Sequence, residues 1–343
     1  MPRRKSKNKK GRSGGVVVLF LLVLLAAAGG AAWLLLTPFG PSTETFVELA
    51  PGSGTMRIGR QLEEAGIVRS QYAFDLARYL RHGKLKAGEY RFDHPVSALE
   101  VYARIARGDV YTRTVVVPEG ANVFDIAARL KKAGVKAGDD FLTEQARLAT
   151  LVSDMDPDAK SLEGYLFPDT YKFPRAATAE QVCNTMVRRF RAAAAQLGLR
   201  ENVHAVVTMA SLVERETARD DERPLVASVF QNRLAQKMPL MTDPSVIYGL
   251  QVQGQWRGTI YQSDLRRDTP FNTYIHTGLP PGPVANPGMR SLEAAMQPAQ
   301  TDYLYFVAAG ANPQGRSLFS ATLEQHARDV AGYRRSVKKA GGR

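Results

Sequence analysis

The chain has 343 residues, a single cysteine and a formal net charge of +13. One cysteine excludes an intramolecular disulfide framework. Seven of the first twelve residues are Lys or Arg, so subtracting 7 from 13 leaves a surplus of +6 for the rest of the chain. Much of the positive charge therefore belongs to an N-terminal tail, and we expect no nucleic-acid partner.

An uncharged apolar stretch follows the basic tail of residues 1–14 and runs from Gly15 to Leu36. At about 1.5 Å per residue, a helix of this length crosses a hydrocarbon core of roughly 30 Å. The alanines at 26–32 resemble a signal-peptide cleavage site, but the apolar run continues past them through Trp33. We predict an uncleaved transmembrane anchor over residues 15–37, with a cytoplasmic N-terminus and the chain after Pro38 outside.

A weak internal repeat divides the next part of the chain after a linker at 38–44. Six residues recur sixty-eight positions later: Gly52, Ile58, Leu62, Ala65, Gly66 and Ile67 as Gly120, Ile126, Leu130, Ala133, Gly134 and Val135. Each copy predicts a turn, an amphipathic helix and a glycine stop, although shared helix-ending residues alone would give the same pattern. We predict an α+β chain with small α+β modules at 45–113 and 114–153 and a mixed α+β domain at 154–343.

The last part of the chain alternates helical patterns with loops rich in glycine and proline. Near the end, the sequence predicts a helix over 291–296, a strand over 303–307 and a helix over 318–336. The loops fall at 161–173, 241–249 and 271–288, and combine aromatic, acidic and proline residues. Such loops hold a fixed shape and either bind ligands or support a site.

Glu214 ends an amphipathic helical pattern that starts at Val203. It falls on the same face as Val203, Val207 and Ala210. Burial on an apolar face favours the protonated carboxyl group, which is the form that a general acid needs. The alternative is a capping box formed by Ser211 and Glu214, but the apolar periodicity begins well before Ser211.

Glu216 lies about 200° from Glu214 around the same helix. We predict that Glu216 is solvated, and that the mixed charge run 215–223 before Pro224 is surface. Cys183 is expected to be a buried structural residue. The five histidines lack metal-ligand spacing and no nucleophile motif is present, so we expect no metal, no cofactor and no serine-triad chemistry.

Several motifs in this part of the chain are those of a known family. They are Leu-Glu-Gly-Tyr at 162–165 with Phe-Pro-Asp-Thr at 167–170, Ala-Ser-Leu-Val-Glu at 210–214, Thr-Asp-Pro at 242–244 with Tyr-Gly at 248–249, Asn-Thr-Tyr at 272–274, and Gly-Leu-Pro-Pro-Gly at 278–282 with Asn-Pro-Gly at 286–288. In this order they resemble the endolytic murein transglycosylases, the YceG-like family. In the Ala-Ser-Leu-Val-Glu motif only Leu212 differs from the family, which often has another aliphatic residue at this position.

The resemblance implies a lyase in the inner membrane, with a LysM-like module at 114–153 and its catalytic part outside the cytoplasm. It would cleave the MurNAc–GlcNAc bond within nascent peptidoglycan strands, leaving 1,6-anhydroMurNAc ends, with peptidoglycan synthases as partners. The matched motif makes Glu214 the single general acid and base. Ten residues are expected to bind substrate or to support the loops: Glu163, Tyr165, Asp169, Tyr171, Thr242, Asp243, Tyr248, Asn272, Tyr274 and Asn286.

One carboxyl group is enough for this chemistry, because the sugar's own C6 hydroxyl is the nucleophile and can return a proton to the acid. Hydrolytic glycosidases generally need two carboxyl groups. The competing hypothesis is a non-catalytic murein-binding scaffold for synthesis proteins, in which Glu214→Gln would leave function intact. A membrane-anchored protease is disfavoured, because no nucleophile and base pair or metal arrangement is evident.

Overall fold

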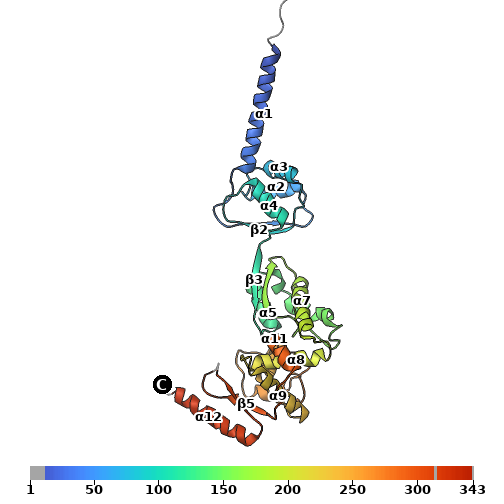
Figure 1. Cartoon of the computed structure of the whole chain (residues 1–343), viewed down its shortest axis with the longest axis vertical. Helices are drawn as coiled ribbons and strands as arrows, with labels where there is room; N and C mark the ends of the chain where they lie inside the picture. Colours follow the sequence, from blue (N-terminus) through green and yellow to red (C-terminus); the bar gives the residue numbers. More distant parts are fainter. Residues whose placement is uncertain (1–11, 313–314, 342–343) are drawn as a thin grey trace, which may run out of the picture. The chain divides into compact units, whose positions relative to one another are not determined.

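The computed structural model describes residues 12–312 and 315–341, so the basic tail of residues 1–11 lies outside the described part. The chain divides into two compact units, the first ending at Thr112 and the second beginning at Arg113. The described residues form helices and three small two-stranded sheets (Figure 1). The predicted mixed α+β class is confirmed.

The first unit begins with a long apolar helix, α1 (Arg12–Leu36). Its segment Gly15–Leu36 is long and apolar enough to cross a membrane, by length and composition. At its C-terminal end Leu35 is buried in the core of the first unit. The guanidinium of Arg69 lies over the ring of Trp33, 4.5 Å from its centroid, so the helix end packs against the folded part of this unit.

The rest of the first unit is a strand, two helices, a strand and a further helix: β1 (Thr45–Leu49), α2 (Thr55–Glu64), α3 (Gln71–Arg81), β2 (Gly88–Phe92) and α4 (Ala98–Arg107). β1 and β2 are antiparallel, with Thr45 opposite Phe92. The helices bury Leu62, Phe74 and Ile105 in the core. Burial removes these apolar side chains from water, and this is the main favourable contribution to the folding of the unit.

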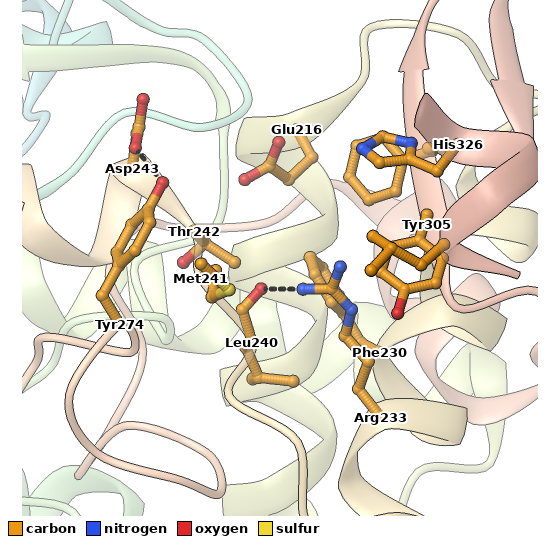
Figure 2. Close-up of a pocket in the computed structure, with 12 residues that line it drawn as sticks. Glu216, Phe230, Arg233, Leu240, Met241, Thr242, Asp243, Tyr274, Tyr305 and His326 are labelled. Atoms are coloured by element: carbon orange, nitrogen blue, oxygen red, sulfur yellow. Dashed lines mark hydrogen bonds between the residues drawn. The ribbon is translucent and has the colours of Figure 1, made fainter. Parts of the chain in front are cut away.

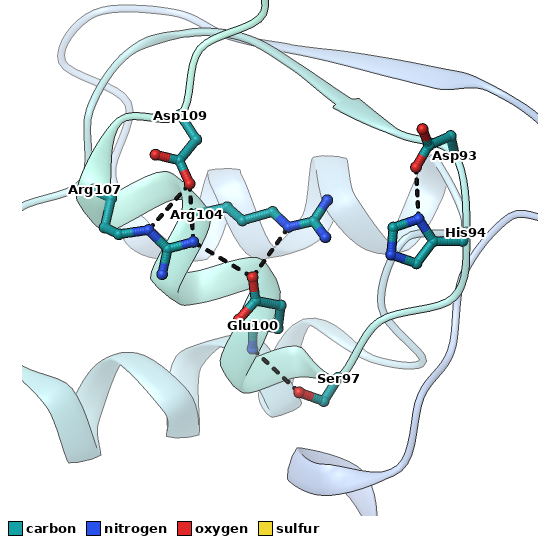
Figure 3. A network of polar contacts seen from close by, with 7 residues as sticks. All are labelled: Asp93, His94, Ser97, Glu100, Arg104, Arg107 and Asp109. Carbon is teal, nitrogen blue, oxygen red and sulfur yellow. Dashed lines mark hydrogen bonds and ion pairs between the residues drawn. The ribbon is translucent and has the colours of Figure 1, made fainter.

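A polar network fixes the two ends of α4 (Figure 3). The Ser97 hydroxyl accepts a hydrogen bond from the Glu100 amide, 3.2 Å away, and caps the N-terminus. The Glu100 carboxylate pairs with Arg104 at 3.2 Å, and Arg107 pairs with Asp109 at 2.9 Å. These ion pairs are partly exposed and screened, so they set local geometry more than stability.

The second unit starts with the same order of elements that the repeat predicts. β3 (Thr112–Val117), α5 (Val123–Lys132), the short helices η1 (Lys136–Gly138), α6 (Phe141–Arg147) and η2 (Leu148–Val152), and then β4 (Asp169–Pro174) follow one another, and β3 pairs with β4. α2 and α5 are each followed by a glycine in the left-handed region, Gly66 at φ 68° and Gly134 at φ 70°. Only glycine adopts this conformation without strain, so both copies use the same helix stop.

The remaining elements of the second unit are mostly helical. They are α7 (Ala179–Leu197), α8 (Val203–Glu216), α9 (Arg223–Ala235), α10 (Asp243–Val252), η3 (Asp264–Arg266), α11 (Met289–Met296), β5 (Tyr305–Ala308), β6 (Ser317–Ser320) and α12 (Leu323–Gly341). The predicted helix at 291–296 and strand at 303–307 are confirmed as α11 and β5. The helix predicted from 318 is wrong at its start, because residues 317–320 pair with β5 as β6.

Cys183 on α7 is fully buried, as predicted. Burial raises the pKa of its thiol to about 12. A thiol in this state is not a nucleophile at neutral pH.

α8 is buried on more than one face. Val207 and Ala210 belong to one core cluster with α7 and β3, whereas Met209, Leu212 and Val213 belong to a second cluster with α9 and α10. The middle of α8, residues 207–213, is therefore buried on every side, whereas Ala205 and Arg215 are exposed. Glu214 and Glu216, at the end of the helix, are partly buried by neighbouring elements.

Candidate active site

The last residue of α8, Glu216, lines a cavity of about 470 Å³ (Figure 2). The prediction that Glu216 is a solvated surface charge is wrong. The cavity is formed by the end of α8, by α9, by the start of α10 and by β5 and α12, and its lining residues are Glu216, Phe230, Arg233, Leu240, Met241, Thr242, Asp243, Tyr274, Tyr305, Phe306, Leu323 and His326.

The pKa of Glu216 is raised to about 7. Burial is the main cause, and the negative charge of Asp243 raises the pKa further, whereas Arg215 and Arg233 lower it. A carboxyl group with a pKa near 7 carries a proton on about half of the molecules at neutral pH. It can therefore donate that proton and take it back, as general acid–base catalysis requires.

Arg233 on α9 holds the wall of the cavity together. Its Nε donates to the carbonyl oxygen of Leu304 at 2.7 Å, and its Nη1 donates to that of Leu240 at 2.8 Å. These bonds join the segment before α10 to the segment before β5. The guanidinium also lies 5.4 Å from the ring centroid of Tyr305, so one cation orders three parts of the lining.

Three of the ten predicted binding residues line this cavity: Thr242, Asp243 and Tyr274. The hydroxyl of Tyr274 donates to Asp243 Oδ1 at 2.6 Å. The backbone amide of Thr242 donates to the Thr273 hydroxyl at 3.0 Å, which fixes the loop before α10. Asp243 and Tyr274 thus face the cavity that holds Glu216 (Figure 2).

Glu214 lies at a different place, although only two positions away. Its side chain is 5% exposed. Oε1 accepts a hydrogen bond from Arg223 Nη2 at 3.0 Å, and Oε2 accepts one from the Gly288 amide at 2.9 Å. Glu214 borders neither the cavity of Figure 2 nor the second cavity described below. The capping-box alternative is wrong, because α8 begins at Val203 and Ser211 Oγ donates to the Thr208 carbonyl.

A second carboxylate shares this position with Glu214. Glu119 lies 3.6 Å from Arg223 Nη2, and its pKa is raised by burial and by the negative charge of Glu214. Arg223 is only 4% exposed and also pairs with Asp220. The surface prediction for residues 215–223 is therefore wrong for Arg223 and for Glu222, which are buried.

Six of the other predicted binding residues are buried among protein atoms: Glu163, Tyr165, Tyr171, Tyr248, Asn272 and Asn286. Their polar atoms bond to the protein. Asn272 Nδ2 donates to the Arg267 carbonyl at 2.7 Å, and the Tyr171 hydroxyl donates to the Phe167 carbonyl at 2.6 Å. In this structure these side chains support the loops and are not accessible to a sugar.

Glu163 is the centre of one of these internal networks. Its Oε2 accepts from the Val123 amide at 2.9 Å, and its Oε1 accepts from Asn286 Nδ2 at 2.8 Å. Asn286 in turn accepts from the Leu166 amide and donates to the Ala121 carbonyl. Burial raises the pKa of Glu163 to about 8. The network connects the start of α5 to two distant loops.

The tenth predicted residue, Asp169, lies at the start of β4 and is partly exposed. It accepts a hydrogen bond from Arg189 Nε at 2.8 Å, which is the main reason that its pKa is lowered. It does not line the cavity that holds Glu216.

No group of three or more His, Cys, Asp and Glu side chains is arranged to hold a metal ion among residues 12–312 and 315–341. Sequence reasoning missed Glu216, Arg233, Tyr305, Phe306 and His326 as lining residues. One signal was available, since residues 203–213 carry no charged Asp, Glu, Lys or Arg side chain and are apolar at eight of eleven positions, which predicts a helix buried on more than one face.

The fold and the cavity define a class of protein. It is an α+β chain with an N-terminal apolar helix, and its second unit holds a cavity that is lined by the carboxyl group of Glu216. The family model for the YceG-like family matches residues 47–332. The chain belongs to the YceG-like family.

Named proteins that are similar to this chain are consistent with this family membership. An endolytic murein transglycosylase of Bacillus subtilis is 34% identical over 315 residues, covering 85% of this chain and 86% of the relative. One from Streptococcus pneumoniae strain D39 is 31% identical, and the match covers 86% of this chain and 60% of that longer protein. A 2.6 Å crystal structure of a YceG-like protein from Listeria monocytogenes matches 84% of this chain and 99% of its own, at 32% identity and a TM-score of 0.53.

Proposed function

We propose that this chain is a membrane-anchored lytic transglycosylase that cuts within peptidoglycan strands. The reaction cleaves the MurNAc–GlcNAc bond and leaves a 1,6-anhydroMurNAc end. Family membership and the names of the relatives support the substrate and the reaction. The observation that carries the mechanism is Glu216, a carboxyl group with a pKa of about 7 in a cavity lined by polar and aromatic side chains.

In the proposed mechanism Glu216 acts first as an acid and then as a base. It protonates the leaving O4 of GlcNAc as the bond from C1 of MurNAc to that oxygen breaks. The C6 hydroxyl of the same MurNAc then forms the new bond to C1 and gives its proton to the Glu216 carboxylate. The enzyme ends in its starting state and no water is consumed, so a second carboxyl group is not required.

Glu214 was the sequence-based choice for this role, and we propose Glu216 instead. Both oxygens of Glu214 accept hydrogen bonds, from Arg223 and from the Gly288 amide. Glu216 borders open volume that a sugar can enter, and Glu214 lines neither the cavity of about 470 Å³ nor the one of about 420 Å³ that Glu216 lines. We assign to Glu214 the positioning of the loop at Gly288 against the end of α8.

The deciding experiment compares the full-length protein with Glu216→Gln and Glu214→Gln on purified glycan strands. We expect Glu216→Gln to lower cleavage by at least about 100-fold, with an unchanged melting temperature. Glu214→Gln should retain turnover and lose thermal stability. Products lighter by one water than reducing ends identify the anhydro sugar by mass spectrometry.

Each other outcome has a definite meaning. Full loss in Glu214→Gln together with activity in Glu216→Gln would restore Glu214 as the acid. Ordinary reducing ends would show a hydrolase, with Asp243 as the candidate second carboxylate. Wild-type protein that binds strands and never cuts them would establish the competing function, a murein-binding scaffold.

The location of the site follows from the same proposal. We propose that α1 spans the inner membrane with its N-terminus in the cytoplasm, which places the catalytic part outside, close to the newly made strands and their synthases. The apolar segment and the basic tail before it support this orientation. The two strand–helix–helix–strand groups, in β1–β2 and β3–β4, support a LysM-like role in holding the glycan.

A further inference from the structure

A second cavity, of about 420 Å³, adjoins the first at Glu216. Glu216 and Phe306 line both cavities. The other walls of the second cavity come from the loop after α8, through residues 217–222, and from the β5–β6 hairpin. Each volume is in the range that holds a small ligand, and Glu216 is part of the lining of both.

The floor of the second cavity is fixed by Glu222, which is 3% exposed. Glu222 Oε1 accepts from the Ser317 amide at 2.8 Å, and Oε2 accepts from the Ser317 hydroxyl at 2.9 Å. The Thr217 hydroxyl donates to the same carboxylate at 3.4 Å. These bonds tie β6 to the residue that follows Glu216, so the cavity keeps its shape in the absence of a ligand.

The lining of this cavity suits a neutral polar ligand with an apolar face. Arg219 lines the cavity, and 33% of its side-chain surface is exposed. Its charge is offset by Asp221 at 3.1 Å and Glu222 at 3.6 Å, so an anion gains little here. Phe306 and Val307 supply apolar surface. A sugar ring presents one apolar face, with hydroxyl and acetamido groups around its edge.

We propose that the second cavity is a glycan subsite, which holds the strand beyond the scissile bond while the first cavity holds the strand before it. This inference rests on the proposed role of Glu216. An acid with binding space on both sides reaches a bond inside a strand, whereas an acid at the closed end of one pocket reaches only a terminus. The second cavity therefore sets the internal position of the cut.

The test uses Arg219→Ala in the full-length protein, with Arg147→Ala as matched control. Arg147 on α6 also pairs with a nearby carboxylate, Glu144 at 3.0 Å, and lines neither cavity. In a Glu216→Gln background, which binds without turnover, we expect Arg219→Ala to weaken the binding of long strands at least about fivefold. In the active background kcat/KM on long strands should fall by a similar factor.

A disaccharide, which fills one cavity only, separates the effect on the second cavity from a general loss of structure. Its binding to the first cavity should not change in Arg219→Ala. Equal loss of disaccharide and strand binding, or strand binding as strong as in Arg147→Ala, would overturn the inference. Either result leaves the proposed function standing as long as wild-type protein produces anhydro ends and Glu216→Gln does not.

Discussion

At the scale of single residues, the charge on Asp243 controls the proton on Glu216. The Asp243 carboxylate raises the pKa of Glu216, which is about 7. A general acid loses activity as pH rises through its pKa, so we expect cleavage by the wild-type protein to decline above about pH 7. In Asp243→Asn the pKa of Glu216 falls, and this alkaline limb moves to lower pH.

The measurement is the pH profile of kcat on glycan strands. Asp169→Asn is the matched control, because Asp169 is an acid of the same type that lies outside both cavities and pairs with Arg189. Its profile should coincide with that of the wild type. An alkaline limb that stays in place in Asp243→Asn would contradict the electrostatic coupling.

Glu163 gives a second prediction at this scale, on stability. Burial raises the pKa of Glu163 from 4.5 to about 8. The folded protein therefore holds this proton where the unfolded chain has lost it. The resulting stability is fully present below about pH 4.5 and is lost as pH rises toward about 8.

Chemical denaturation at a series of pH values measures this contribution. Over that window the free energy of unfolding should fall less steeply with pH in Glu163→Gln than in the wild type, by at most about 1.4 kcal/mol per pH unit. A constant loss is also expected, because the new amide NH₂ faces one of two donors, the Val123 amide or Asn286 Nδ2, and that hydrogen bond is lost. Parallel pH curves would show that Glu163 does not titrate in this range.

At the scale of the elements, a glycine sets how closely the 161–167 loop packs on α8. Gly164 has φ +88°, and a Cβ there would lie 2.5 Å from Pro283 Cγ and 2.7 Å from Val207 Cγ1. Gly198, which ends α7, has φ +71° and open space around it. Both glycines adopt the left-handed conformation, but only at Gly164 would a side chain also collide with neighbouring atoms.

We therefore expect the two alanine variants to differ. Gly198→Ala should cost about 1–2 kcal/mol, the strain of a left-handed alanine. Gly164→Ala should cost clearly more, since the loop must also move away from α8. Melting temperatures or denaturant midpoints measure both. Equal losses would mean that the loop is free to shift, and that it does not hold α8 in place.

At the scale of the whole molecule, the chain has separate apolar cores in its two units. Ile105 is fully buried in the core of the first unit, and Leu292 is fully buried in that of the second. Each alanine substitution should cost about 2–5 kcal/mol within its own unit. Hydrogen exchange should show faster opening of α4 and β2 in Ile105→Ala, and of α8 and α11 in Leu292→Ala. Faster exchange throughout both units in either variant would show a single cooperative fold.

Local patterns were sufficient to predict several features of this chain. The apolar run of α1, the repeated helix stops at Gly66 and Gly134, the buried Cys183 and the family motifs were all readable, because each depends on composition or on spacing within one segment. For α8, the predicted burial of Glu214 is confirmed, and the predicted exposure of Glu216 is wrong. Glu214 is indeed shielded from solvent, but periodicity describes one helix at a time.

The elements that cover the opposite face of that helix could be identified only in the folded protein. α9, α10, β5 and α12 come from positions up to 110 residues later in the chain, counted from Glu216 to His326, and together they line the cavity that Glu216 borders. Their approach partly buries the Glu216 carboxyl group and raises its pKa, whereas Arg223 and the Gly288 amide donate hydrogen bonds to the Glu214 carboxylate. Burial and charge at a site are sums over neighbours that are distant in sequence, and so no spacing within α8 could assign the two glutamates.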